Sequence, residues 1–324
     1  MKVGILGAGG CFALDFARHL DSLGIDHFGI GRSGPKAPPF WLAPKGYRYH
    51  ALHLVTQLHE TMEVIDDERP DVVVNYAAQG EGAASFGENA PDFFMTNCVG
   101  LSRLVLELQK RPYIKRTVWI GSSEVYGSEQ NGAKESDPLL PTSPYGASKA
   151  AFDHYLNIMW RTSKFPMNIV RPSNCYVEGQ QLHRVIPKAI ICALSGKKLP
   201  LQGGGRSLKS YLHARDLSRA VLMVIEKAPL GETYNVGPDE PVSIRYLVER
   251  VARACGVAFE DLVAEAPERV GQDAKYHLDT ASIRNLGWRD YAQIPLSIGL
   301  DGMVHWVRSY PELLTADTAY RHRA

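Results

Sequence analysis

The stretch MKVGILGAGGCFA, residues 1–13, decides the fold. It joins a short apolar run at 3–6 to a segment of helical period that continues to residue 23. Glycines between a strand and a helix let the backbone approach a pyrophosphate, and the helix N-terminus adds unpaired N–H groups and a favourable dipole. Such a turn also occurs as a plain strand-to-helix connection, but its place after a first strand favours a dinucleotide site. Five residues are assigned to that site: Gly7, Gly9, Gly10, Cys11 and Phe12.

Strand-length apolar runs alternate with helical segments along the first half of the chain. The runs lie at 3–6, 28–30, 72–75, 117–121 and 168–171, and the helical segments at 12–23, 58–68, 93–109 and 144–160. Short β-rich runs separated by helices predict a parallel sheet covered on both faces. The fold class is therefore α/β, a doubly wound parallel sheet.

After Arg171 the regular alternation gives way to loops, turns and short helices. We expect residues 1–172 to form a dinucleotide-binding domain, with 211–240 returning to it. Residues 173–210 and 241–315 are expected to form a smaller α/β lid that binds the substrate. Residues 316–324 are polar and predict a frayed tail.

Composition excludes several classes of function. Lys and Arg number 36 against 35 for Asp and Glu, so no global field favours nucleic acid or an anionic membrane. The longest nearly apolar stretch, 186–194, is far short of the ~20 residues that span a bilayer, and the N-terminus does not resemble a signal peptide. The five cysteines are widely spaced and form no C-x-x-C pair, and the histidines lack metal-ligand spacing. We expect a cytoplasmic enzyme without a metal.

The end of the second strand, GIGRS at 29–33, bears on the choice of cofactor. An NAD enzyme usually carries an acidic residue there to hold the ribose 2′-hydroxyl. Here Gly31 makes room, and the planar fork of Arg32 suits a 2′-phosphate. NADP is therefore favoured, with NAD as the alternative. Arg32 could instead be a solvated loop residue that stacks on the adenine.

Two segments carry the chemistry: IGSSEVYG at 120–127 and SPYGASK at 143–149. Ser143 suits a helix N-cap, so Tyr145 and Lys149 fall one turn apart on one helix face. A phenol has a pKa near ~10, and acting as a base near neutrality needs a shift of about 3 units, or about 4 kcal/mol. Lys149 and a cationic nicotinamide are charges that could supply this shift. By itself, Y-x-x-x-K also fits an ordinary amphipathic helix.

Ser122, Ser123 and Glu124 complete the predicted catalytic set. Tyr145 would take the proton of a sugar hydroxyl, and Ser122 would hydrogen-bond the same oxygen. Oxidation makes the neighbouring C–H acidic, and Glu124 could remove that proton. If strand geometry persists, the two-residue step returns Glu124 to the side of Ser122. The alternative is that Glu124 is a solvated residue near a turn.

Several further segments resemble one family. They are PDVVVNYAAQ at 70–79 with Asn97, RPSNCY at 171–176, GGG at 203–205 followed by KSYLHARD at 209–216, GETYNVG at 231–237 and LGW at 286–288. With the glycine turn and the two catalytic segments, they resemble the extended short-chain dehydrogenase/reductases that act on nucleotide sugars. Within that group the chain is most similar to the nucleoside-diphosphate-hexose 4,6-dehydratases.

The resemblance implies a homodimeric lyase with a tightly bound dinucleotide and a nucleotide-diphosphate-sugar substrate. It also implies roles for residues that the motifs alone leave unassigned. Those expected at the cofactor are Ala77, Ala78, Gln79, Asn97, Pro172 and Ser173. Those expected at the substrate are Asn174, Arg184, Val185, Pro187, Lys209 and Arg269.

The chain departs from the family pattern at several positions. Ala13 replaces the third glycine of the turn, residues 51–54 lack an adenine-binding aspartate, and Lys209 stands where an arginine is usual. Ser123 stands where dehydratases of the deoxythymidine type have aspartate. Ser-Ser-Glu is more similar to guanosine-diphosphomannose dehydratases, some uronic-acid decarboxylases and 4-keto-6-deoxysugar reductases. The first expectation is a 4,6-dehydratase, and the alternatives are a ketoreductase, C4 epimerase or decarboxylase, or a cofactor sensor without catalysis.

Overall fold

The computed structural model describes residues 1–34, 37–80, 82–128, 131–268, 274–288 and 293–322. A seven-stranded parallel sheet has the order β11-β6-β5-β4-β1-β2-β3. Its strands are β1 (Lys2–Leu6), β2 (Asp26–Gly31), β3 (Tyr49–Ala51), β4 (Val72–Asn75), β5 (Arg116–Ile120), β6 (Met167–Pro172) and β11 (Thr233–Val236). The strand order reverses beside β1, and open α/β sheets bind ligands at such a reversal. The predicted doubly wound α/β fold is confirmed.

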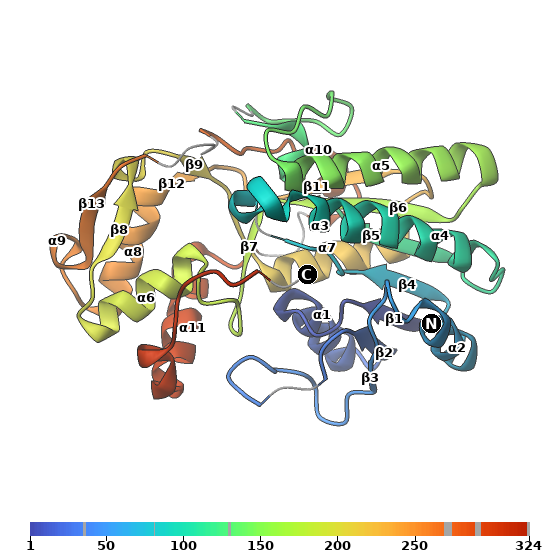
Figure 1. Cartoon of the computed structure of the whole chain (residues 1–324), viewed down its shortest axis with the longest axis horizontal. Coiled ribbons are helices and arrows are strands. Elements are labelled where there is room, and N and C mark those ends of the chain that lie inside the picture. Colours follow the sequence, from blue (N-terminus) through green and yellow to red (C-terminus); the bar gives the residue numbers. More distant parts are fainter. Residues whose placement is uncertain (35–36, 81, 129–130, 269–273, 289–292, 323–324) are drawn as a thin grey trace.

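Helices cover both faces of this sheet (Figure 1). Helices α1 (Cys11–Ser22) and α7 (Ala214–Lys227) pack on one face, where the buried Phe16 and Leu217 belong to one apolar cluster. Helices α2 (Leu58–Glu68), α4 (Leu101–Gln109) and α5 (Pro144–Ser163) contribute to the cluster on the other face. The sheet is thus buried on both sides, which is why β4 reads as the continuous run VVVN.

The predicted helix over 93–109 is not regular. Helix α3 (Ala90–Phe94) leads into a π-helical turn at Met95–Gly100 before α4 begins. A π turn accommodates an extra residue and changes which side chains face inward. Asn97 lies in this turn and is completely buried.

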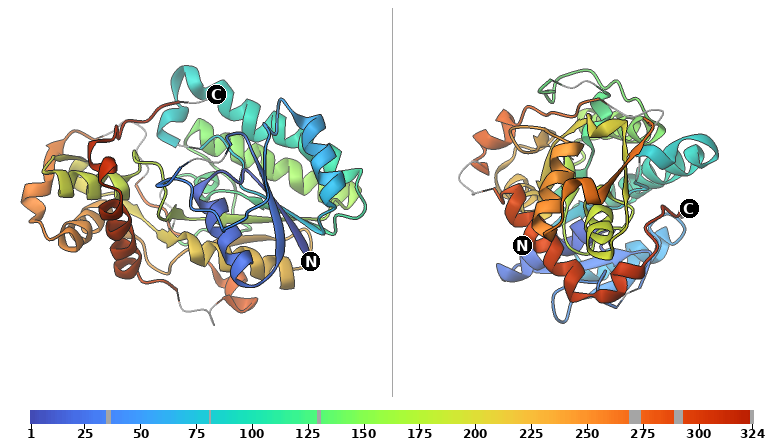
Figure 2. Two further views of the ribbon diagram at one scale, coloured as in Figure 1. Left: turned by 90° about the horizontal axis from the view of Figure 1, so that it is seen from below. Right: turned by 90° about the vertical axis from the view of Figure 1, so that its left-hand side faces the viewer.

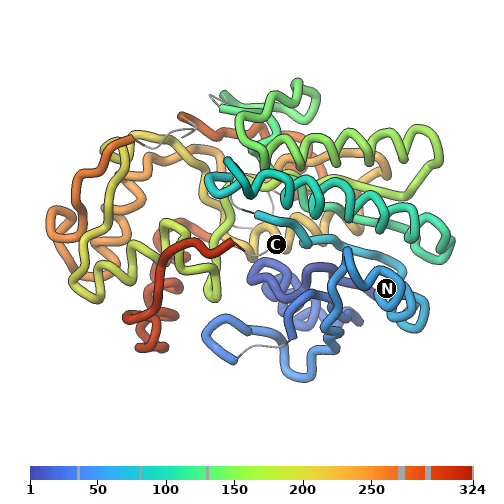
Figure 3. Tube along the Cα trace, in the orientation of Figure 1, coloured from blue at the N-terminus to red at the C-terminus, as the bar shows by residue number. Residues whose placement is uncertain are grey.

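The second part of the molecule forms a separate lobe beside the sheet, as the trace in Figure 3 shows. It has its own apolar core. Helices α6 (Val185–Ser195), α8 (Ile244–Cys255) and α11 (Leu296–Ser309) pack together there, with the short helix α9 (Phe259–Leu262) beside them. Three strand pairs complete it: β8 (Leu199–Gln202) with β13 (Val263–Ala266), β9 (Leu208–Lys209) with β12 (Val242–Ser243), and β7 (Asn174–Tyr176) with β10 (Tyr211–His213). Helix α10 (Ala281–Asn285) lies beside β11.

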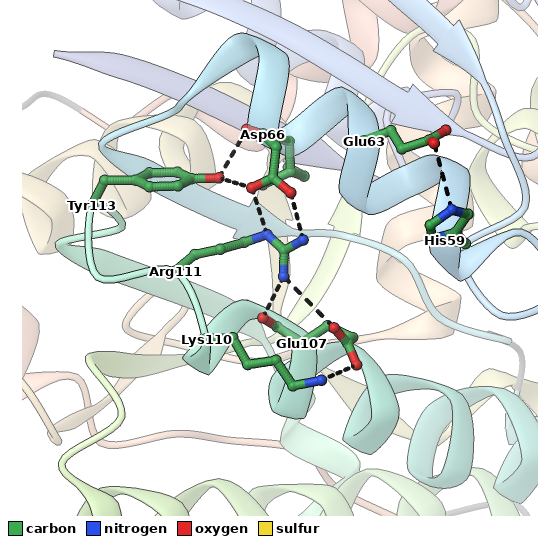
Figure 4. Close-up of polar contacts among 8 residues, drawn as sticks. His59, Glu63, Asp66, Glu107, Lys110, Arg111 and Tyr113 are labelled. Carbon is green, nitrogen blue, oxygen red and sulfur yellow. Dashed lines mark hydrogen bonds and ion pairs between the residues drawn. The ribbon is translucent and has the colours of Figure 1, made fainter.

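A polar network fixes α2 to the end of α4 on the surface (Figure 4). The guanidinium of Arg111 donates two hydrogen bonds, of 2.8 and 2.6 Å, to the carboxylate of Asp66. Tyr113 donates a third hydrogen bond to Asp66, of 2.7 Å. These donors hold the pKa of the Asp66 carboxyl below its usual value, chiefly through the hydrogen bond from Arg111. The residues of the network precede β4 and β5 in the chain and lie toward the amino ends of these strands, away from the carboxyl ends where such sheets bind ligands, so we assign the network to stability.

The expectation of a frayed tail is wrong for the described residues, 316–322. His322 lies 2.7 Å from a carboxylate oxygen of Asp92 on α3, and the ring of Tyr320 packs edge-on against His183. Figure 2 shows the tail running from α11 across to the teal helix α3. No described helix combines the length and apolar character needed to cross a bilayer.

Candidate active site

The segment after β5 places the predicted catalytic residues. Ser122 is extended and caps a 3₁₀ turn at Ser123–Tyr126, and its hydroxyl oxygen accepts a 3.1 Å hydrogen bond from the backbone N–H of Glu124. Strand geometry therefore ends at Ile120, so the alternation argument for Glu124 is wrong. The tight turn, not the strand, keeps Glu124 beside Ser122. Ser123 is buried.

The carboxylate of Glu124 points into the protein. Its Oε2 atom accepts a 3.3 Å hydrogen bond from the hydroxyl of Ser143, the N-cap of α5. A Cβ atom placed on Gly82 would lie only 2.5 Å from the same oxygen. Only a glycine at position 82 leaves room for the carboxylate in this orientation. Glu124 is half-buried and does not match the alternative of a solvated turn residue.

Tyr145 and Lys149 lie one turn apart on α5, as predicted. The backbone N–H of Tyr145 donates to the hydroxyl of Ser85 at 3.0 Å, and its ring packs edge-on against Phe93. Lys149 is 2% exposed, and its Nζ atom donates a 2.7 Å hydrogen bond to the main-chain oxygen of Ile120. Burial lowers the pKa of Lys149 to about 8.

A buried clamp ties the loop after β4 to this helix. The side-chain amide of Asn97 accepts a hydrogen bond from the main-chain N–H of Gln79 at 2.7 Å and donates one to the main-chain oxygen of Gln79 at 2.9 Å. It also donates to the hydroxyl of Ser148 at 3.0 Å, and that hydroxyl donates to the main-chain oxygen of Tyr145 at 2.7 Å. Asn97 was expected at the cofactor. The structure shows it positioning the loop of Ala77, Ala78 and Gln79 against the catalytic helix.

The glycine turn forms a cradle beside this loop. Gly7 has a φ of +70°, and a Cβ atom there would lie 2.6 Å from the Cα atom of Ala77. Helix α1 has neither a side-chain cap at Gly10 nor an acidic residue in its first turn. Its N-terminal N–H groups are therefore suited to an anion. The side chain of Cys11 is buried beside Val177 and Ala214, and burial raises the pKa of its thiol to about 12, so the thiol stays neutral. Phe12 packs against the same cluster.

The far end of the cradle holds a tyrosine that the sequence analysis did not single out. The hydroxyl of Tyr49 donates a 2.5 Å hydrogen bond to the main-chain oxygen of Ser33. A Cβ atom on Gly31 would lie 2.6 Å from that hydroxyl, and one on Gly9 3.1 Å from it. Burial raises the pKa of Tyr49 to about 12, so this hydroxyl stays neutral. Arg32, which was expected to bind a 2′-phosphate, is exposed.

The residues from the end of β6 to the start of α6 lie where the sheet meets the second part. Of these, Pro172 and Ser173 were expected at the cofactor, and Asn174, Arg184, Val185 and Pro187 at the substrate. Pro172 ends β6, the N–H of Ser173 donates to the Val236 oxygen at 2.8 Å, and Asn174 begins β7. Arg184 is the N-cap residue of α6, followed by Val185 and the buried Pro187. Its Nη2 atom lies 4.0 Å from a Cβ atom placed on Gly80, which brings it to the loop after β4.

Lys209 ends β9, directly before Ser210, whose main-chain oxygen accepts a 3.0 Å hydrogen bond from the N–H of Asn174. The ammonium of Lys209 lies over the ring of Tyr276, 3.5 Å from the ring centre, in the β9–β12 pair. Arg269 falls outside the described residues. Within the described chain, no group of His, Cys, Asp and Glu side chains is arranged to hold a metal.

Sequence reasoning missed the residues that support the catalytic set from a distance. They are Ser85, Gly82, Tyr49, Asp92 and His322. Each contacts a site residue through the fold and carries no local motif. Ser143 was recognised as a helix cap, but not as a hydrogen-bond donor to Glu124.

Comparisons with known proteins agree with this geometry. The model of the "NAD dependent epimerase/dehydratase family" matches residues 3–237. A dTDP-glucose 4,6-dehydratase of Neisseria gonorrhoeae is 36% identical over 273 residues, covering 76% of this chain and 77% of that protein. One from Streptomyces niveus is 34% identical and covers 74% and 70%. The chain therefore belongs to the NAD dependent epimerase/dehydratase family.

Solved structures give the same result. The dTDP-glucose 4,6-dehydratase DesIV of Streptomyces venezuelae, with NAD bound, superposes with a TM-score of 0.87 at 26% identity, covering 96% of this chain and 98% of that one. The Bacillus anthracis dehydratase, in complex with NAD, has a TM-score of 0.84 at 25% identity and covers 96% and 98%. The extended short-chain dehydrogenase/reductase architecture expected from the motifs is confirmed.

Proposed function

We propose that the chain is a nucleoside-diphosphate-hexose 4,6-dehydratase, which converts its substrate to the 4-keto-6-deoxy sugar. The observation that carries this proposal is the inward-facing carboxylate of Glu124, which accepts a hydrogen bond from Ser143 at the start of the helix that carries Tyr145 and Lys149. A reductase or an epimerase needs the tyrosine and lysine but has no use for a base at C5. The relatives named as dTDP-glucose 4,6-dehydratases support the same activity.

Each catalytic side chain has one task in this reaction. Tyr145 takes the proton of the C4 hydroxyl, while Ser122 hydrogen-bonds the same oxygen. The ammonium of Lys149 stabilises the resulting phenolate. The C4 ketone makes the C5 proton acidic, and Glu124 removes it. The carboxyl of Glu124 can then give this proton to the C6 hydroxyl, which leaves as water. The dinucleotide, when bound, supplies hydride chemistry with no net redox change.

The residues present fit a dinucleotide. A side chain on Gly7 would collide with the backbone of Ala77 and one on Gly9 would crowd the hydroxyl of Tyr49, and α1 offers its N–H groups to a pyrophosphate. We infer that NAD, rather than the NADP favoured by sequence, is the resident cofactor. The neutral hydroxyl of Tyr49 beside Gly31 suits a ribose hydroxyl better than a phosphate, and the two solved dehydratases above hold NAD.

The substrate is a nucleoside diphosphate sugar, held from the second part of the molecule. Asn174, Arg184, Val185 and Pro187 are the residues proposed to contact the diphosphate. The position of Arg184 at the N-terminus of α6 supports this role, because its guanidinium and the N–H groups of the first helical turn can both bind an anion. Lys209 and Arg269 are kept as further candidates. Thymidine is the first base to test, given the named relatives.

We propose the division of the chain expected from sequence, with 1–172 and 211–240 holding the cofactor and 173–210 and 241–315 holding the sugar nucleotide. We also propose a cytoplasmic homodimer that pairs through α3, α4 and α5. Large apolar side chains are exposed on these elements: Phe94, Met95, Val99, Leu106 and Ile158. An apolar patch of this kind is typical of a contact between subunits.

Incubation with dTDP-glucose and with uridine and guanosine sugar nucleotides tests the activity. The expected product has lost one water and absorbs at alkaline pH. Glu124→Gln should still oxidise C4 but release no water. Glu107→Gln, at a half-buried residue of α4 that pairs with Lys110 and Arg111, should react like the parent protein. Unimpaired water loss by Glu124→Gln would rule out Glu124 as the C5 base. Absence of water loss by the parent protein with every one of these substrates would contradict the dehydratase and favour a reductase or epimerase.

A further inference from the structure

The C-terminal tail ends in a hydrogen-bonded chain of three side chains. The Nε2 atom of His322 lies 2.7 Å from Oδ2 of Asp92, and its Nδ1 atom lies 3.1 Å from the hydroxyl of Tyr320. A carboxylate can only accept from a ring N–H, so Nε2 carries a proton. In the neutral ring, Nδ1 is then the acceptor for the tyrosine hydroxyl. Asp92 and Tyr320 together fix the orientation of the imidazole.

The loop after β4 connects this imidazole to the catalytic residues. The side-chain nitrogen of Gln79 is 3.5 Å from Nδ1 of His322. Three residues further along, Gly82 lies against the Glu124 carboxylate, and Ser85 accepts from the N–H of Tyr145. One short loop thus contacts the tail, the proposed C5 base and the proposed C4 base.

Phe93 gives a second connection. Its ring centre lies 6.0 Å from that of His322 and 6.2 Å from that of Tyr145. The imidazole and the phenol therefore pack against the same buried ring. Asp92 and Phe93 are consecutive residues of helix α3, so the hydrogen-bond partner of His322 and the ring against which it packs come from the same helical turn.

The other end of the tail contacts the proposed diphosphate site. The ring of Tyr320 meets that of His183 edge-on, with ring centres 5.1 Å apart. His183 directly precedes Arg184, the N-cap of α6. The described tail thus spans from α11 in the second part of the molecule to α3 beside the sheet, and the left panel of Figure 2 shows its path toward the teal helices.

We propose that the tail forms one wall of the sugar site, and that His322 is a positioning residue that holds Gln79 and closes the site over the hexose. This inference rests on the proposed function, because it concerns the same site. The ketone formed at C4 must stay enclosed until water has left C6. A wall that links the two halves of the site excludes solvent during that interval.

The test uses the full-length protein and two substitutions. His322→Ala should raise the KM for the nucleotide sugar by about tenfold, the effect of losing one charge-assisted hydrogen bond. It should also release some of the 4-keto hexose before water is eliminated, which mass spectrometry detects. Asp92→Ala should reproduce both effects, since it removes the partner of Nε2. His322→Gln should restore part of the affinity, because its amide can still donate to Asp92.

Arg321→Ala is the matched control. Arg321 is exposed and pairs only with Asp317 among the contacts that the structure records for it, at 2.8 Å within the tail. It should keep the parental KM and release no intermediate. Equal KM values and equal product purity in the His322→Ala, Asp92→Ala and Arg321→Ala proteins would overturn the proposal.

A binding measurement separates this inference from the proposed function. Trypsin cuts after Arg321, and a bound nucleotide sugar should slow that cut in the parent protein but not in the His322→Ala protein. If no sugar nucleotide is turned over but a bound nucleotide sugar still slows the cut after Arg321, the dehydratase assignment is contradicted and the proposal that the tail forms a wall of the site is supported. If turnover is seen but His322→Ala is protected as well as the parent, the wall fails and the dehydratase stands.

Discussion

The Nζ atom of Lys149 donates a 2.7 Å hydrogen bond to the main-chain oxygen of Ile120, the last residue of β5. This bond joins the helix that carries Tyr145 to the strand that leads into Ser122 and Glu124. The catalytic residues of two segments, separated by some twenty residues in sequence, are thereby held in one place. Lys149 is also almost fully buried, so its charge has a cost in stability.

Replacing Lys149 with Met should make the protein more stable near neutral pH while abolishing turnover. Burial lowers the pKa of Lys149 from 10.5 to about 8, so between these values the unfolded chain binds more protons than the folded one. The stability of the parent protein therefore rises with pH through that range. The variant's free energy of unfolding should exceed that of the parent by up to about 3 kcal/mol near neutral pH, less the contribution of the lost hydrogen bond to Ile120. This difference should shrink as the pH rises.

Urea unfolding of both proteins at about pH 7 and about pH 10 measures this change. A stability difference that is the same at both pH values would contradict the prediction.

Tyr145→Phe removes the phenol that takes the C4 proton. We expect turnover to fall by about 10²–10⁴-fold, the usual contribution of a positioned general base. The hydroxyl oxygen of Ser85 would still accept from the backbone of residue 145, so the helix should keep its place. Calorimetry should find an unchanged affinity for the nucleotide sugar, and a large loss of affinity would instead assign Tyr145 to binding.

Ser143→Ala should affect both stability and rate. The Ser143 hydroxyl caps α5 by accepting from Gly146 at 3.0 Å, and it donates to Glu124. Loss of a cap costs about 1 kcal/mol, and the freed carboxylate should lower kcat as well.

The matched control is Ser243→Ala, which removes a cap of the same kind at α8, where Ser243 accepts from Tyr246 at 3.0 Å. It should lower the midpoint of thermal unfolding by a similar amount and leave kcat alone. If both variants lose activity in proportion to stability, the contact with Glu124 has no catalytic role.

Tyr49→Phe tests the choice of cofactor. Removal of the hydroxyl beside Gly9 and Gly31 should weaken NAD binding severalfold, the cost of one neutral hydrogen bond, and narrow any preference over NADP. Tyr47→Phe is the control, because the Tyr47 hydroxyl is buried without a hydrogen-bond partner in the described structure. The measurement is the amount of each dinucleotide that co-purifies. Equal NAD content in the two variants would remove Tyr49 from the cofactor site.

Sequence reasoning succeeded where the signal is local. The glycine turn and the pair of Tyr145 and Lys149 each lie within one element, so periodicity and helix-capping rules place them. The parallel sheet follows from the alternation of strands and helices, which is a property of the whole half-chain.

It failed where a contact joins distant segments or a turn breaks a regular period. Glu124 lies in a 3₁₀ turn that no strand rule anticipates. His322 meets Asp92 across 230 positions, and nothing in a polar tail indicates such a partner. The preference for NADP depended on residues 29–33 alone, because Tyr49, which reaches the same place, comes from another strand.

The π turn at Met95–Gly100 has a consequence for how the family can change. Such a turn behaves as a single-residue insertion in a helix. Deleting Cys98 or Val99 would let the segment wind as one uninterrupted α-helix and would rotate Asn97 out of its pocket. The shortened protein would keep its sheet but would lose the hydrogen bonds between the Asn97 side chain and Gln79. The sequence changes that this enzyme tolerates are therefore limited by the number of residues in this segment as much as by their identity.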